Sequence, residues 1–308
     1  MKTTETCKFI LLASVIGVAT FRGTSLYGGN VFYNQTGGDW NSAANWYGSI
    51  LPSSSDQAII PQGASTTIDS ADGTIANSLI GGGGASGWGG TGIAFLNLAA
   101  GGSLNVTGTF GVQRNANGTV SSFNMSGGTL SSHVFSVGNS SSQNTGTATI
   151  IGGILTTYQL NVGYGTLGAS VGSMVIQGSG ATIATTAGNS VNFFQTGTLQ
   201  YDIFNSGISV LNASLSTVNF NSGSTLVLDG SSYTGGANTF TLLTYGTLAT
   251  YSPTIDYNSF SGYNVSVVND TTDSELNLVI TPVPEPGIIA LVVAGFMVAT
   301  LPRTRNKK

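Results

Sequence analysis

Short stretches of alternating apolar and polar residues follow one another through most of the chain. In Thr147-Ala148-Thr149-Ile150-Ile151 and in Ser216-Thr217-Val218-Asn219-Phe220, apolar residues occupy every second position. Successive side chains of a strand point to opposite faces, so this alternation predicts strands with one buried face. Similar stretches continue through residues 26–281, and no helical periodicity interrupts them. The pattern therefore predicts an all-β body.

Glycine recurs along this body at a nearly constant spacing. Six segments with a common apolar–Gly–small–apolar plan have reference glycines at successive separations of 26, 25, 27, 17 and 26, namely Gly102, Gly128, Gly153, Gly180, Gly197 and Gly223. Val137-Gly138 and Val162-Gly163 repeat at a separation of 25. Glycine suits corners that need positive φ, and a coil of this length can stack on the next at about 4.8 Å.

We therefore expect a right-handed parallel β-helix, a solenoid of about ten coils on the order of 50 Å long. An antiparallel sandwich or an irregular two-sheet solenoid is the alternative. The repeats are expected over residues 61–235. A tryptophan-containing segment at 26–60 is expected to cap one end, since a solenoid end otherwise exposes unpaired strand edges. Strand-like stretches within 236–281 are expected to close the other end.

Composition and charge narrow the classes of function. Glycine accounts for 45 of the 308 residues, and charged residues for only 6%. Between Leu26 and Pro284 the only base is Arg114, against ten acids: Asp39, Asp56, Asp69, Asp72, Asp202, Asp229, Asp256, Asp270, Asp273 and Glu275. Nucleic-acid binding needs clustered Lys and Arg to release counterions, so we expect no nucleic-acid partner.

The two ends of the chain have the patterns of targeting segments. Lys2 and Lys8 precede an apolar run at residues 9–19, as in a secretory signal peptide, which we assign to 1–25. At the other end an uncharged apolar stretch at 287–301 is followed by four cations, Arg303, Arg305, Lys307 and Lys308. This order predicts a transmembrane helix with a cytoplasmic tail.

The C-terminal segment, residues 282–308, resembles the PEP-CTERM sorting signal. The resemblance lies in Val283-Pro284-Glu285-Pro286, the short apolar stretch and the basic end. It implies export by a Gram-negative bacterium that makes exopolysaccharide and processing by an exosortase-like enzyme. The body resembles β-helical proteins with autotransporter-associated repeats, in which a tryptophan-containing segment precedes glycine-rich coils. That second resemblance implies a surface structure and no active site.

The candidate chemical groups favour a scaffold over an enzyme. His133 is the only histidine, and the only cysteine, Cys7, lies in the predicted signal segment, so we expect no metal site and no cofactor. Two acidic groups, Asp69 with Asp72 and Asp270 with Asp273 and Glu275, lie in polar turn contexts where Asp commonly caps backbone amides. Calcium at the second group remains open. We expect no catalytic residues.

These observations predict an exported structural or adhesive protein. It would be anchored in the cell envelope by its C-terminal helix until processing, and then reside at the cell surface or in the extracellular matrix. Its expected partners are an exosortase-like enzyme and extracellular polysaccharide. The alternative is a β-helical polysaccharide lyase or glycoside hydrolase. Parallel β-helices include such enzymes, but a single arginine supplies little charge to neutralise an acidic substrate.

Overall fold

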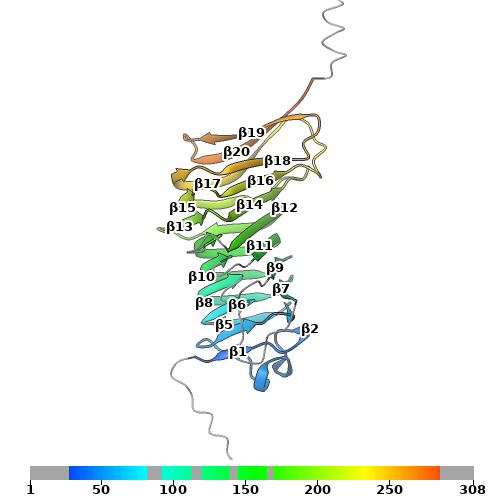
Figure 1. The fold of residues 1–308 in the computed structure, drawn as a ribbon, viewed down its shortest axis with the longest axis vertical. Coiled ribbons are helices and arrows are strands. Elements are labelled where there is room, and N and C mark those ends of the chain that lie inside the picture. Colours follow the sequence, from blue (N-terminus) through cyan, green and yellow to red (C-terminus); the bar gives the residue numbers. More distant parts are fainter. Residues whose placement is uncertain (1–27, 82–91, 113–119, 139–144, 165–169, 285–308) are drawn as a thin grey trace, which may run out of the picture.

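The computed structural model describes residues 28–81, 92–112, 120–138, 145–164 and 170–284. The predicted signal segment and the predicted transmembrane stretch lie outside these ranges. The described part is an elongated stack of strands, with its N-terminal residues at one end and its last strands at the other (Figure 1).

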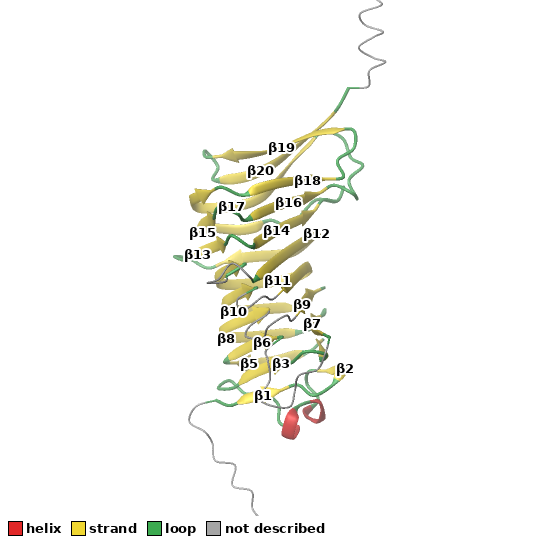
Figure 2. Cartoon of the chain, viewed as in Figure 1, coloured by secondary structure: helices red, strands yellow, loops and turns green. Residues whose placement is uncertain are grey.

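The described residues form twenty strands and two short 3₁₀ helices. In chain order these are β1 (Asn30–Phe32), β2 (Thr36–Asp39), η1 (Ala43–Asn45), η2 (Tyr47–Ser49), β3 (Gln57–Ile60), β4 (Ser65–Ile68), β5 (Ala71–Ile75), β6 (Asn77–Ile80), β7 (Ile93–Leu98), β8 (Ser103–Val112), β9 (Val120–Met125), β10 (Thr129–Val137), β11 (Thr145–Val162), β12 (Val171–Thr185), β13 (Ser190–Phe193), β14 (Gly197–Asp202), β15 (Leu211–Phe220), β16 (Thr225–Asp229), β17 (Asn238–Tyr251), β18 (Thr254–Asn258), β19 (Tyr263–Asp270) and β20 (Glu275–Pro282). The two helices lie beside β1 and β2 at the N-terminal end (Figure 2).

Parallel pairing from coil to coil builds three faces. The first face contains β1, β3, β6, the C-terminal parts of β8, β10 and β11, then β13 and the C-terminal parts of β15 and β17. The second contains β2, β4, β7, β9, the starts of β11 and β12, then β14, β16 and β18. The third contains β5, the starts of β8 and β10, the middle of β11, the end of β12 and the starts of β15 and β17.

The predicted parallel β-solenoid is thus confirmed, and the antiparallel sandwich is excluded for the body. The number of coils was overestimated: the solenoid has about seven turns, not about ten. The reason is that the two ends contribute few complete turns. Residues 28–56 add only the short strands β1 and β2 to the parallel ladder, and the chain reverses direction in its last strands.

The reference glycines lie at two different corners of the coil. Gly102, Gly128, Gly153 and Gly180 lie where the chain passes from the second face to the third, whereas Gly197 and Gly223 lie between the first face and the second. The irregular separation of 17 between Gly180 and Gly197 marks this change of corner. Val137 and Val162, by contrast, are partners in register on β10 and β11, as their spacing predicts.

The N-terminal end is closed by aromatic side chains. Trp40 and Trp46 are 2% and 1% exposed, and their rings meet edge to face with centroids 4.7 Å apart. The indole Nε1 of Trp46 donates a hydrogen bond of 2.8 Å to the carbonyl oxygen of Trp40, and Tyr33 packs against Trp46. These rings form a lid of the kind expected from the tryptophan-containing segment, with the polar indole atom satisfied.

The C-terminal end is closed by a reversal of chain direction. β20 runs antiparallel to both β17 and β19, so the last strands form an antiparallel sheet on the final coil. The chain leaves β20 at Pro282, and the amide of Val283 donates a hydrogen bond of 2.9 Å to the carbonyl oxygen of Gly262. Within the described ranges no helix is long and apolar enough to cross a membrane.

Candidate functional site

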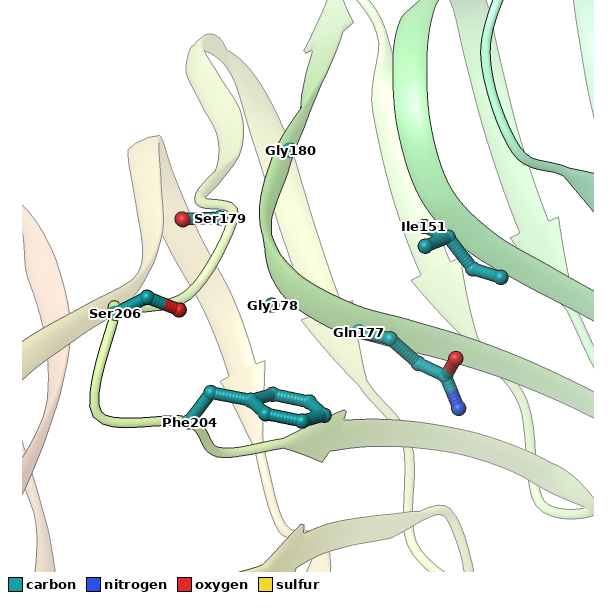
Figure 3. A pocket seen from close by; sticks show the side chains of 7 residues that line it. All are labelled: Ile151, Gln177, Gly178, Ser179, Gly180, Phe204 and Ser206. Atoms are coloured by element: carbon teal, nitrogen blue, oxygen red, sulfur yellow. The ribbon is translucent and has the colours of Figure 1, made fainter. Parts of the chain in front are cut away.

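A shallow hollow lies at the corner between the second and third faces, toward the C-terminal half of the solenoid. Its volume is about 320 Å³, at the small end of the range for ligand sites. Three successive coils contribute to it, and its lining residues are Ile151, Gln177, Gly178, Ser179, Gly180, Phe204 and Ser206 (Figure 3).

The corner is held in place by a serine from the next coil. Ser209, which is 3% exposed, donates from its hydroxyl to the carbonyl oxygen of Gly178 at 2.9 Å and accepts from the amide of Ala181 at 2.9 Å. Gly178 has φ of 62°, a conformation that costs other residues free energy. The tight turn on which Phe204 lies is closed by a bond from the Gly207 amide to the Phe204 carbonyl oxygen.

The floor of the hollow is apolar. Phe204 is partly exposed, and its ring borders the open space in Figure 3. Ile151 lies on the other side of Gln177 from this ring. Ile151 is 41% exposed and lies on the preceding coil. The two side chains offer an aromatic face and an aliphatic edge to a ligand.

The polar rim depends on Asp202, the last residue of β14. Its Oδ2 accepts a hydrogen bond of 2.6 Å from Nε2 of Gln177, and its Oδ1 accepts one of 2.7 Å from Nε2 of Gln200. Both carboxylate oxygens therefore already have amide donors. The amide of Gln177 is oriented by this bond, and its carbonyl oxygen can accept a hydrogen bond from a hydroxyl in the hollow.

No sequence motif marks Gln177, Asp202 or Phe204 as site residues. A signal was available: Gln177, Asp202 and Asp229 are separated by 25 and 27 residues, one coil each, and they are successive partners in register on the second face. Polar residues that recur at the coil period share one column of the surface. Asp229 accepts from the amide of Ser231 at 2.9 Å.

His133 lies at a different corner, between the third face and the first. It is exposed, and its ring stacks on Tyr158 of the next coil with centroids 4.4 Å apart and planes 12° apart. This corner contributes nothing to the hollow. The stack places two aromatic rings on the surface but brings no carboxylate to His133 through any hydrogen bond that the described residues show.

Of the acidic residues named from the sequence, Asp270 and Glu275 accept hydrogen bonds from the backbone and from neighbouring side chains. Oδ1 of Asp270 accepts from the amides of Thr272 and Asp273, and Oε2 of Glu275 accepts from Thr241 and Asn277. Asp69 is exposed at a corner, and the side chain of Asp72 lies outside the description. Within the described ranges no three His, Cys, Asp or Glu side chains cluster closely enough to hold a metal ion.

Only the first two residues of the predicted sorting motif lie within the described part of the chain. Val283 is 45% exposed and follows β20 directly, and Pro284 is the last described residue. Glu285 and Pro286 lie outside the described residues, as do the basic residues Arg303, Arg305, Lys307 and Lys308. The motif therefore begins directly after β20.

Comparison with known proteins gives no relative: no family model, no curated protein and no solved structure matches this chain. The chemistry of the hollow must therefore be inferred from its own side chains. It combines one aromatic ring, one aliphatic side chain, one oriented amide and two exposed serines. Such a set can stack against an apolar surface and exchange hydrogen bonds with hydroxyl groups.

Proposed function

We propose that this protein is an exported, non-enzymatic solenoid that acts as a structural or adhesive element at the cell surface or in the extracellular matrix, in association with exopolysaccharide. The observation that carries the proposal is the hollow at Phe204, which presents stacking and hydrogen-bonding groups on a surface without lysine or arginine among the described residues. We take the coil to be right-handed, as crossover connections between parallel strands nearly always are.

Sorting by an exosortase-like enzyme is the second part of the proposal. The signal segment 1–25 would direct export, and the apolar stretch with its basic end would hold the chain in the membrane of a Gram-negative cell until processing at Val283–Pro286. The end of β20 at Pro282 supports this reading. Cleavage beyond Pro284 would release a body whose last strand is intact.

The sorting proposal is tested by replacing Pro284, Glu285 and Pro286 with alanine in the native host. We expect a change in the mass of the mature protein and in its release from the envelope. The control is Pro253→Ala, which removes a proline of the body and should leave processing unchanged. A triple variant with the same mass and release as the wild type would refute the assignment of the motif.

A polysaccharide lyase or glycoside hydrolase is the competing function. One observation favours it: Asp202 and Asp229 are partners in register on adjacent strands beside the hollow, and glycosidases use pairs of carboxyl groups about 5 to 10 Å apart. The amide bonds to both oxygens of Asp202 favour a structural role. Depolymerisation of any glycan by the wild type, lost in Asp202→Asn and Asp229→Asn, would establish an enzymatic function. Absence of turnover would favour the structural or adhesive function.

A further inference from the structure

We infer that the hollow at Phe204 binds one uncharged sugar unit of a polysaccharide chain and rejects uronic acids. The inference rests on the proposed function only in taking polysaccharide as the partner. It adds to that function a location, a mode of binding and a class of sugar.

The apolar contact comes from Phe204. The face of an aromatic ring carries partial negative charge, and it attracts the slightly positive C–H groups that a pyranose presents on its flat side. Ile151, 41% exposed on the coil below, adds an aliphatic contact at the edge of the hollow. A volume of about 320 Å³ has room for a sugar unit and leaves the rest of the polymer outside.

The polar contacts lie around the ring. Gln177 is fixed by its bond of 2.6 Å to Asp202, so its amide oxygen is positioned before a ligand arrives. Ser179 and Ser206 are exposed on the rim and can both donate and accept. A sugar hydroxyl also donates and accepts, so it matches each of these groups. Figure 3 shows the ring of Phe204 between Ser206 and Gln177, with Ser179 above Ser206.

Charge selects among sugars. The described residues include ten carboxylates and no lysine or arginine, so an incoming uronate meets repulsion and no cation to neutralise it. A cationic sugar would need a carboxylate oxygen to bind directly. No acidic residue lines the hollow, and each oxygen of Asp202 beside it already accepts one amide hydrogen bond, from Gln177 or from Gln200. An uncharged sugar requires neither a cation nor a carboxylate in the hollow.

The turn that bears Phe204 is held on both sides, so little order has to be gained on binding. Ser209 bonds it to Gly178 and Ala181 of the preceding coil. On the other side, Asn205 and Thr234 of the following coil exchange two hydrogen bonds of 2.8 and 2.9 Å. A ligand site fixed in advance loses less conformational entropy on binding.

The test measures binding of the full-length protein to soluble polymers by calorimetry. The panel contains uncharged glucan, galactan and mannan, a polyuronate and a polyglucosamine. We expect binding to at least one uncharged polymer. Phe204→Ala should weaken it about ten-fold and Gln177→Leu by a similar factor, whereas Phe204→Trp should preserve it. Tyr164→Ala is the matched control, because Tyr164 is a 43% exposed aromatic at another corner.

Each other result overturns the inference in a distinguishable way. If the wild type binds and both hollow variants bind equally well, the hollow is not the site, although association with polysaccharide stands. Tighter binding to the polyuronate or the polyglucosamine refutes the selection by charge. If no polymer binds, the proposed association with polysaccharide fails together with the site. Circular dichroism checks that each variant is folded, and Gln177→Leu decides the matter if Phe204→Ala does not fold.

Discussion

Phe193 and Phe220 occupy the same register position on β13 and β15, and their rings stack with centroids 4.5 Å apart and planes 14° apart. Both side chains are fully buried. The pair shows how this fold is stabilised: each coil places a side chain directly on its counterpart in the coil before, so that backbone pairing and side-chain packing repeat along one axis. Damage to one coil therefore affects both of its neighbours.

Replacement of Phe220 by alanine should lower the free energy of unfolding by about 3–5 kcal/mol, because it leaves a cavity between two coils. Phe220→Leu should cost less. Urea denaturation followed by circular dichroism measures both variants. Leu215→Ala is the control: Leu215 lies in the same strand but is 64% exposed, and a change within about 0.5 kcal/mol is expected. Equal losses for Leu215 and Phe220 would contradict the register described for β13 and β15.

A ladder of amides stabilises the outside of the first face. Asn192 donates to Oδ1 of Asn161 at 2.9 Å and accepts from Nδ2 of Asn219 at 2.9 Å, and Thr250 continues the ladder. Asn192→Ala should cost about 1–3 kcal/mol, since three partners, Asn161, Asn219 and Ser190, lose a hydrogen bond. Asn192→Asp should cost more near pH 7, because a carboxylate there faces the acceptor oxygen of Asn161.

The comparison for this prediction is Asn189→Ala, measured by the same denaturation curve. Asn189 is half-buried, and its Nδ2 donates an exposed hydrogen bond to the carbonyl oxygen of Ala187, two residues away. That local bond connects no coils, so its loss should be nearly neutral. If Asn189→Ala were as destabilising as Asn192→Ala, coil-to-coil amide bonding would not contribute specifically.

Two glycines with the same backbone conformation should respond differently to alanine. Gly163 and Gly188 have φ of 75° and 88°. A Cβ at Gly163 would overlap the backbone of Gly197 in the next coil, whereas one at Gly188 would meet nothing within 4 Å. Gly188→Ala should therefore cost about 1 kcal/mol for the positive φ alone, and Gly163→Ala at least about 3 kcal/mol.

Thermal unfolding of the two glycine variants provides the measurement. A drop in Tm for Gly163→Ala that is no larger than that for Gly188→Ala would show that the corner of the first and second faces relaxes easily. The coils would then be less closely packed at this corner than the structure indicates.

Buried tyrosines should limit stability in alkali. Burial raises the pKa of Tyr251 from 10.0 to about 12. Between these values the unfolded chain releases the phenolic proton and the folded chain retains it, so stability is complete below about pH 10 and falls as the pH rises toward 12. Burial likewise raises the pKa of Tyr201. Denaturation midpoints measured from pH 8 to pH 12 should show this loss.

Phenylalanine variants distinguish the contributions of Tyr251 and Tyr201 to stability. The hydroxyl of Tyr251 is buried without a hydrogen-bond partner among the described residues, so Tyr251→Phe should be neutral or stabilising at pH 7 and should reduce the loss in alkali. Tyr201 donates to the carbonyl oxygen of Leu242 at 2.6 Å, so Tyr201→Phe should cost about 1 kcal/mol at pH 7. A clear loss of stability in Tyr251→Phe would mean that its hydroxyl has a partner.

Much of the fold was predictable because each coil has the same local requirements, an apolar side chain that points inward and a glycine at the corner. Val137-Gly138 and Val162-Gly163 place valine inward and glycine at the corner, and the chemistry that requires this is local. The number of turns was not predictable from the period alone. Trp40 and Trp46 make the N-terminal segment a lid, and β20 reverses direction, so these residues extend the chain without adding full coils.

The hollow could not be predicted because nothing in the sequence distinguishes its residues from their neighbours. Gln177, Asp202 and Phe204 match no motif, and their common corner appears only when the coils are aligned in register. Asp270 and Glu275 attracted attention because they are close in sequence, yet their oxygens accept bonds within the closing sheet. In a solenoid, residues one coil apart are better candidates for a shared surface than residues that are adjacent in the chain.

The antiparallel course of β20 has a consequence for how this molecule is used. A parallel ladder whose ends stayed open could recruit further copies and grow into a fibre. Here β20, a strand of opposite polarity, ends the ladder of the third face within the chain. The length of that ladder is therefore set by the number of coils that the sequence encodes.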